Sequence, residues 1–144
     1  MYDVEQSINV KRDDTIVLGM GIATLTAVNG AVPITVADVS GFDIAGIMID
    51  AGAVSSPALL RVGTQHADNG GDRGRGRGHP TDQSKPTGIQ DVFFRVGGPH
   101  VGKATVSLAV NSDNVILYDI WAWRADTGIG VGWAVSTAAT GGAV

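Results

Sequence analysis

The sequence predicts an all-β fold, a right-handed parallel β-helix of about five coils without substantial helix, and three observations support it. Short β-rich segments recur at a nearly constant interval, glycine makes up 21 of 144 residues, and only 17% of residues are charged. A repeat of this length indicates a solenoid, in which each unit buries its apolar face against its neighbours. Glycine at this density opposes long helices, because each interior glycine costs about 1 kcal/mol. The rival fold is a β-sandwich or jelly roll.

A series of short β-rich segments sets the period. Its members start at Ile8, Ile34, Leu60, Leu108 and Trp133. Three of the four intervals are nearly equal, as in a solenoid, and the interval from Leu60 to Leu108 is almost twice as long. We expect these segments to stack one per coil, at the strand spacing of about 4.8 Å. The long interval indicates one inserted Gly/Arg-rich loop, residues 65–88, in a single β-helix domain that covers residues 1–144.

A second series predicts a bend within each coil. Its members are Ile44–Ile47, Ile89–Val92 and Leu117–Ile120, with Gly46, Asp91 and Asp119 at the equivalent third position. The first interval of this series contains the insertion, and the second is close to one period. Glycine and aspartate tolerate a left-handed backbone better than most residues do. We therefore predict a one-residue corner at this position, which lets the apolar residues on both sides of it point inward.

Neither end of the sequence carries a recognisable polar cap. The sequence begins within a β-rich pattern and stops at Thr140–Val144. The terminal coils of a solenoid expose apolar faces and unpaired strand edges unless a cap covers them. The sequence therefore indicates either a fragment of a longer β-helix or copies that associate end to end.

Composition argues against several functions. The chain has no cysteine, which excludes disulfides and thiolate chemistry, and its 10 basic and 14 acidic residues do not favour binding to nucleic acid. No run of about 18 apolar residues is present to span a membrane, and no secretory signal opens the sequence. His66, His79 and His100 lack the spacing of metal ligands. We expect no metal and no cofactor.

The inserted segment contains a run of alternating arginine and glycine, Arg73–Gly78. Such runs occur in segments that bind single-stranded RNA. Acidic residues lie nearby in the sequence, at Asp68, Asp72 and Asp82. A solvated loop explains this composition better than an RNA-binding segment.

Five segments carry a resemblance to a known family. They are Tyr2–Val10, Gly41–Asp50, Leu59–Thr64, Gln90–Gly102 and Val110–Gly128. Together they resemble a group of bacterial secreted proteins with a pectate-lyase-like β-helix, related to the glycoside hydrolase family 55 β-1,3-glucanases. The resemblance implies an extracellular protein that binds or processes polysaccharide and, if active, acts as a glycoside hydrolase or lyase. It covers nearly the whole chain apart from residues 67–86.

The most specific part of the resemblance is Asp119–Asp126. The family pattern there is an aromatic pair followed by Ala-Asp-His, and this sequence keeps Asp126 but has Thr127 in place of the histidine. Further on, Ala139 stands where the family has an aspartate. Both departures remove polar groups of the kind that an active site uses. They indicate a protein that is catalytically incomplete.

Three carboxylates are the catalytic candidates: Asp126, Asp119 and Asp91. Glycoside cleavage uses two carboxyl groups, about 5–5.5 Å apart for retention or 6.5–9.5 Å for inversion. Asp91 and Asp119 occupy equivalent positions one coil apart, so their separation suits this chemistry. The alternative is that both are corner residues whose carboxylates bind nearby backbone N–H groups. Asp126 likewise has an alternative role as a turn residue before Gly128.

The aromatic residues near the end of the chain are the candidates for binding sugar. They are Trp121, Trp123, Tyr118 and Trp133, and His100 in a turn is a further candidate. Two tryptophans two residues apart on a strand share one face, and Arg124 faces the other way. If that face points outward, the indoles form a platform for sugar rings. If it points inward, they belong to the core.

Two function classes remain. The first is an extracellular polysaccharide-binding or glycan-processing β-helix, which acts through Trp121, Trp123 and Asp126. The second is structural, a self-assembling β-solenoid that forms oligomers or filaments through its open ends and has no substrate. The expected partners are therefore a polysaccharide or a further copy of the chain.

Overall fold

The computed structural model describes residues 1–64, 82–98 and 100–125. These residues form nine β-strands in chain order. The strands are β1 (Tyr2–Val4), β2 (Ile8–Val10), β3 (Ile16–Ala27), β4 (Ile34–Val36), β5 (Asp43–Ala51), β6 (Ser56–Val62), β7 (Thr87–Gly97), β8 (Ala104–Val110) and β9 (Val115–Ala125). Within the described ranges, no helix is long and apolar enough to cross a membrane.

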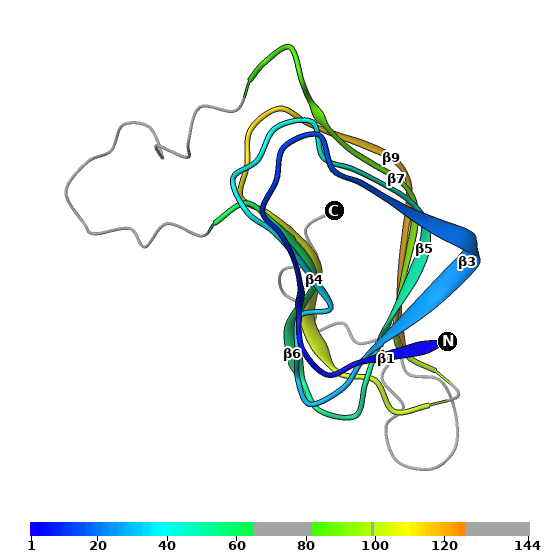
Figure 1. The fold of residues 1–144 in the computed structure, drawn as a ribbon. Helices are drawn as coiled ribbons and strands as arrows, with labels where there is room; N and C mark the ends of the chain where they lie inside the picture. Colours follow the sequence, from blue (N-terminus) through cyan, green and yellow to red (C-terminus); the bar gives the residue numbers. More distant parts are fainter. Residues whose placement is uncertain (65–81, 99, 126–144) are drawn as a thin grey trace.

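The strands alternate between two parallel sheets. Sheet A has the order β1-β3-β5-β7-β9, and sheet B has the order β2-β4-β6-β8. Each strand of one sheet is followed along the chain by a strand of the other, so one pair of strands makes one coil. Figure 1 shows the coils behind one another, with the strands of each sheet overlapping in the view. The predicted parallel β-helix is therefore confirmed.

The first series of apolar segments stacks in register, as predicted. Ile8 pairs with Ile34, Ile34 with Leu60, and Leu60 with Leu108, all within sheet B. The insertion after Thr64 does not disturb this alignment. The last member of the series, Trp133, lies outside the described residues.

The second series forms the predicted bends in sheet A. Gly46, Asp91 and Asp119 have φ angles of 68°, 50° and 51°, in the left-handed region. The flanking apolar residues of β5 and β7 are buried: Ile44, Ile47, Ile89 and Val92. In β9, the last described strand, Leu117 takes the equivalent inward position but is 37% exposed.

β3 makes the same bend in a different way. Its pairing with β5 shifts between Leu18 and Ala23, so the four residues Gly19–Ile22 occupy the place that Gly46 fills alone in β5. Gly21 and Ile22 both have positive φ angles, 73° and 56°. β3 bows outward beyond the other strands of sheet A as a result (Figure 1). The sequence did not predict this bulge.

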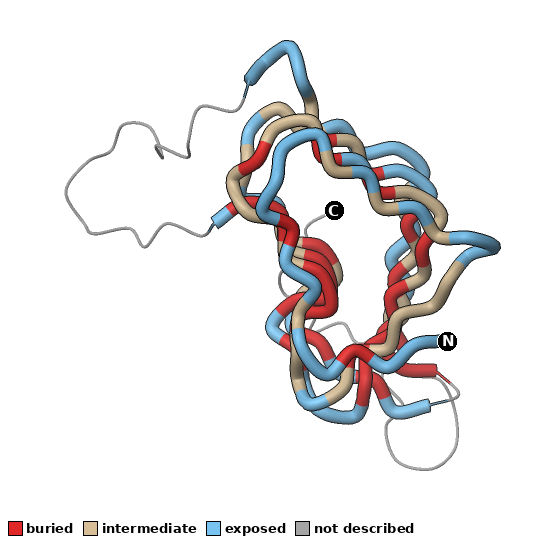
Figure 2. The backbone as a smooth tube through the Cα atoms, in the orientation of Figure 1, coloured by how far each residue is buried: buried red, intermediate tan, exposed pale blue. Residues whose placement is uncertain are grey.

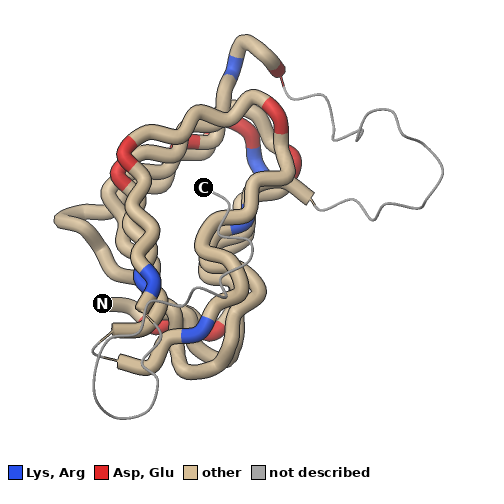
Figure 3. Tube along the Cα trace, turned by 180° about the vertical axis from the view of Figure 1, so that it is seen from behind, with Lys and Arg blue, Asp and Glu red and all other residues tan. Residues whose placement is uncertain are grey.

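The core lies between the two sheets and consists of aliphatic and phenylalanine side chains, as expected for a narrow β-helix. The largest fully buried side chains include Phe42, Phe94, Ile34, Leu60 and Ile89. Figure 2 shows buried residues alternating with more exposed ones along the strands of each coil. Acidic and basic residues lie both at the turns and along the strands (Figure 3).

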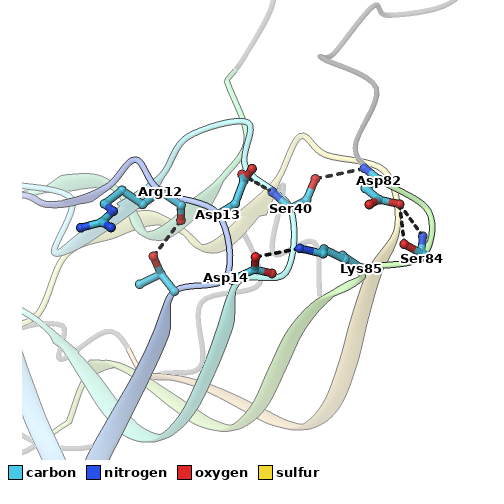
Figure 4. A network of polar contacts seen from close by, with 8 residues as sticks. Arg12, Asp13, Asp14, Ser40, Asp82, Ser84 and Lys85 are labelled. Carbon is cyan, nitrogen blue, oxygen red and sulfur yellow. Dashed lines mark hydrogen bonds and ion pairs between the residues drawn. The ribbon is translucent and has the colours of Figure 1, made fainter.

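A network of polar contacts joins the turns that lead from sheet B into sheet A (Figure 4). Lys85 Nζ lies 2.7 Å from Asp14 Oδ2, and the backbone N–H of Ser40 donates to Asp13 Oδ1 at 3.0 Å. Asp82 Oδ1 accepts hydrogen bonds from the backbone N–H and the hydroxyl of Ser84. These contacts tie the chain that follows the insertion to the preceding coils.

Candidate functional site

The outer face of sheet A carries an apolar groove of about 410 Å³. Its lining comes from four neighbouring strands. The lining residues are Ile22 of β3, Met48 of β5, Phe93, Phe94 and Arg95 of β7, and Trp121 and Trp123 of β9. Binding sites for organic ligands combine a largely apolar lining with a few polar groups, and this groove has that character.

Register explains why these residues meet. Met48 pairs with Phe93, and Phe93 pairs with Trp121, so three large apolar side chains form one row across the coils. The rings of Phe93 and Trp121 are 6.3 Å apart between centroids and inclined at 57°. Such tilted aromatic pairs contribute about 0.5–1.5 kcal/mol beyond burial. The row is therefore a stable apolar surface.

Both tryptophans lie on the outer face of β9. Trp121 is 64% exposed and Trp123 is 36% exposed. Of the two orientations that the sequence left open, the structure therefore shows the outward one. Arg124 lies on the opposite side of the strand, where its Nη1 donates to the backbone carbonyl of Ala104 at 3.0 Å.

A second row beside the first brings charge to the groove. Asp50, Arg95 and Trp123 are paired in register in β5, β7 and β9. Arg95 Nε donates to Asp50 Oδ1 at 2.8 Å, and Arg95 Nη2 donates to Asp50 Oδ2. The hydrogen bonds from Arg95 to Asp50 raise the pKa of the arginine above its ordinary value. A guanidinium has five N–H donors, and Asp50 accepts from two of them in the described structure.

Two of the three predicted catalytic carboxylates, Asp91 and Asp119, occupy the bends and do not line the groove. Asp91 and Asp119 are exposed and lie opposite each other in neighbouring coils, between the paired residues Gln90–Tyr118 and Val92–Ile120. Tyr118 is also exposed, on the far side of the Asp119 bend from the tryptophans. Asp126 lies outside the described residues.

The remaining candidate residues are not brought into this groove by the described structure. His100 is exposed in the connection between β7 and β8 and does not line the groove. Trp133 is outside the described residues, as are Thr127 and Ala139. Within the part of the chain that the structure describes, no group of three His, Asp or Glu side chains is placed to hold a metal ion.

Apart from Phe94, whose side chain is buried, sequence reasoning missed four groove residues, Ile22, Met48, Phe93 and Arg95. A signal for three of them was present. Met48, Phe93 and Trp121 each follow the start of a member of the second series by the same number of positions, and Arg95 and Trp123 do so a little further along. Extending that alignment would have found both rows. Ile22 carried no such signal, because its strand departs from the repeat.

A second hollow of about 490 Å³ lies on the outer face of sheet B. It is more polar, and Asn9, Lys11, Thr35, Arg61 and Thr64 contribute to its lining. Thr35 Oγ1 donates to Asn9 Oδ1 at 2.5 Å, and the Thr64 backbone N–H donates to Asp38 Oδ1 at 2.9 Å. No aromatic side chain lines it among the described residues, so it lacks the stacking surface of the groove on sheet A.

Known proteins resemble this chain along nearly its full length. An exo-β-1,3-glucanase of Streptomyces sp. (strain SirexAA-E / ActE) is 43% identical over 138 residues, which is 96% of this chain and 21% of the relative. Two solved structures of sacteLam55A from Streptomyces sp. SirexAA-E, one of a variant in complex with glucose, each have a TM-score of 0.74. They are 43% and 42% identical to this chain and share 91% of it.

The chain spans about a fifth of the length of these relatives. The match to the family described as the LAM55 pectate lyase-like domain extends over residues 1–144. The fold, the register of its coils and this match agree. The chain belongs to the LAM55 pectate lyase-like domain family.

Proposed function

We propose that this chain is a glucan-binding β-helix of a secreted β-1,3-glucan-processing protein, and that it holds the polysaccharide in the groove on sheet A. The observation that carries the proposal is the outward-facing row of Met48, Phe93 and Trp121 beside the guanidinium of Arg95. The proposal includes a single β-helix domain over residues 1–144 with its insertion at residues 65–88. The 43% identical relative is an exo-β-1,3-glucanase, which supports a glucan as the ligand.

The groove has the two kinds of contact that sugar binding requires. Trp121, Trp123 and Phe93 offer aromatic faces for the apolar C–H faces of pyranose rings. Arg95 offers N–H donors for sugar hydroxyls and is fixed in orientation by Asp50. Because both groups sit on paired strands, little conformational entropy is lost when a ligand binds.

Catalysis is the less complete part of the proposal. Asp91 and Asp119 are the described carboxylates that we assign to a catalytic pair, since strand spacing of about 4.8 Å brings them near the separation that glycosidases use. Asp126 is the third candidate, kept from the family motif. Thr127 and Ala139 replace the histidine and aspartate of the family pattern. We therefore assign glucan binding to this chain and infer that its catalytic site, with these two groups replaced, is incomplete.

Replacing both tryptophans tests the binding role. We expect Trp121→Ala with Trp123→Ala to weaken the affinity for soluble laminarin at least tenfold, because the stacking surface disappears. Affinity electrophoresis or calorimetry measures the change. The matched control is Tyr2→Ala, which removes an equally exposed aromatic side chain from β1. Unchanged affinity in the double variant would show that the two tryptophans do not bind the glucan.

The alternative is a self-assembling β-solenoid with no glycan ligand. The described end strands carry exposed apolar side chains, Tyr2 in β1 and Ile116 in β9, which is the observation that favours it. In that case light scattering detects oligomers or filaments without glycan, and laminarin neither binds nor changes them. Laminarin binding by the unmodified chain decides between the two functions.

A further inference from the structure

The two sheets differ in charge. The described strands of sheet B contain Arg61 and no aspartate or glutamate. In sheet A, by contrast, β1, β5, β7 and β9 all carry aspartate. The chain as a whole has a formal net charge of -4, so the basic character of sheet B is local. A ligand that binds the outer face of sheet B through charge is therefore an anion.

The hollow on sheet B brings two cationic side chains to this face. Lys11, directly after β2, and Arg61 of β6 both line the hollow of about 490 Å³. Lys11 is exposed and Arg61 is partly exposed. Neither forms an ion pair with another described residue. Both cations are thus open to a ligand that enters the hollow.

The acidic residues of the adjoining turns are engaged elsewhere. Asp13 Oδ1 accepts a hydrogen bond from a backbone N–H of the next coil, and Asp14 Oδ2 lies 2.7 Å from Lys85 Nζ. Asp38 Oδ1 accepts from the backbone N–H of Thr64 at 2.9 Å. None of these three aspartates is among the lining residues of the hollow. Its lining therefore contributes positive charge without a neutralising carboxylate.

The two cations are separated along the coil axis by polar groups. Asn9, Thr35 and Arg61 are paired in register across three consecutive coils, and Lys11 belongs to the coil of Asn9. At a strand spacing of about 4.8 Å, the coils of Lys11 and Arg61 lie about 9.6 Å apart. The amide of Asn9 and the hydroxyl of Thr35 also line the hollow. Cations suit acidic groups, whereas amides and hydroxyls suit sugar hydroxyls.

We propose that the hollow on sheet B binds an acidic glycan, a sugar chain that bears carboxylate or sulfate groups. Lys11 and Arg61 bind two acidic groups of the chain, and Asn9 and Thr35 bind hydroxyls of the rings between them. No aromatic side chain lines this hollow among the described residues, so charge supplies the affinity. The site is separate from the groove on sheet A, because the core lies between the two sheets.

Removing the two charges tests the site. The probes are alginate, which bears carboxylates, and dextran sulfate, and calorimetry at low ionic strength measures both affinities. We expect Lys11→Gln with Arg61→Gln to weaken binding of at least one probe about tenfold. The matched control is Arg12→Gln with Lys103→Gln, which removes the same two charges from exposed positions that do not line the hollow. Its affinities should stay within about twofold of the unmodified protein.

The probe that loses affinity identifies the acidic group, and loss for both means that the hollow accepts either. Equal losses in the two double variants, or no binding of either glycan by the unmodified protein, would overturn the site. Polyglutamate, which has carboxylates but no sugar hydroxyls, should bind less tightly than the preferred glycan. Equal binding would instead assign the hollow to an acidic peptide.

Laminarin binding, measured on the same variants, keeps the two sites apart. If laminarin binds the unmodified protein, its affinity should be the same for the Lys11→Gln, Arg61→Gln variant. A loss there would contradict the separation of the hollow from the groove. Absence of laminarin binding by the unmodified protein would overturn the proposed function and leave the acidic-glycan result standing.

Discussion

Two kinds of bend turn the strands of sheet A at the same position. In β5, β7 and β9 a single residue in the left-handed conformation turns the strand: Gly46, Asp91 and Asp119. In β3 four residues, Gly19–Ile22, do the same and also project from the stack. The single-residue bend lets the apolar residues on both sides of it point into the core. The bulge does the same and also adds Ile22 to the lining of the groove on sheet A.

The comparison also explains why the bend in β5 is glycine and the next two are aspartate. A Cβ atom at Gly46 would lie 3.1 Å from the carbonyl oxygen of Gly19, so the bulge leaves little room for a side chain there. Asp91 and Asp119 have no such neighbour, because β7 and β9 follow strands with single-residue bends. The bulge therefore dictates the residue type in the following coil.

Gly19→Ala should have the largest effect on this arrangement. Its new methyl group would overlap with the Gly46 carbonyl, and overpacking of this kind costs about 3 kcal/mol of unfolding free energy. Gly21→Ala is the matched control, since no atom lies within 4 Å of its Cβ position and only its φ of 73° opposes the change. Its cost should be about 1–2 kcal/mol. Urea denaturation measures both, and equal losses would contradict an effect of this overlap.

A pair of exchanges at the bends should have an intermediate effect. Gly46→Asp keeps a residue type that tolerates the left-handed conformation but presses against Gly19, so we expect a loss of about 2 kcal/mol. Asp91→Gly places glycine where no bulge crowds it, and stability should change by less than about 1 kcal/mol. Thermal unfolding of the two variants gives the comparison. A loss for Asp91→Gly as large as that for Gly46→Asp would show that the bulge is not the cause.

The smallest effect is expected at a turn that depends on charge rather than on close packing. Hydrogen bonds from the Ser84 hydroxyl and backbone N–H lower the pKa of Asp82. Since the folded state favours the carboxylate, its stabilisation is present above the ordinary pKa of about 3.9 and is lost as the pH falls through the lower folded value. Ser84→Ala should therefore reduce the loss of stability as the pH falls below about 3.9.

The ion pair of Lys85 with Asp14, in the same set of turns, has the opposite pH dependence. The Asp14 side chain raises the pKa of Lys85, so this stabilisation is present below about pH 10.4 and is lost as the pH rises through the folded value. Both groups are exposed and salt screens them. Melting temperatures across the pH range should accordingly shift less in Ser84→Ala and Lys85→Ala than in the bend variants. A larger shift in either of these two variants than in the bend variants would contradict this ranking of effects.

Much of the fold was predictable because equivalent positions of the repeat carry similar residue types. Ile8, Ile34, Leu60 and Leu108 share one register position, and the bends at Gly46, Asp91 and Asp119 carry the residues that a left-handed backbone favours. The bulge was not predictable by the same reasoning. Ile22 has the wrong propensity for its conformation, and the close approach of Gly19 to Gly46 in the next coil cannot be read from the sequence.

The site was predictable only within a strand. Alternation placed Trp121 and Trp123 on one face, and both are exposed there. The rows that complete the groove depend on pairing between coils, which joins Met48 to Phe93 and Asp50 to Arg95 across the insertion. The catalytic role of Asp91, Asp119 and Asp126 stays a prediction. So does the sugar-binding role of Tyr118, Trp133 and His100.

The long connection between β6 and β7 has a consequence for engineering. Although it makes one coil almost twice as long in sequence as the others, β7 returns to pair with β5 from Asp43 to Asp50. The stack therefore tolerates a change of length at this turn without a change of register. A reporter peptide or an affinity tag grafted between Thr64 and Asp82 would leave the groove on sheet A intact and provide a handle for attaching the protein to a surface.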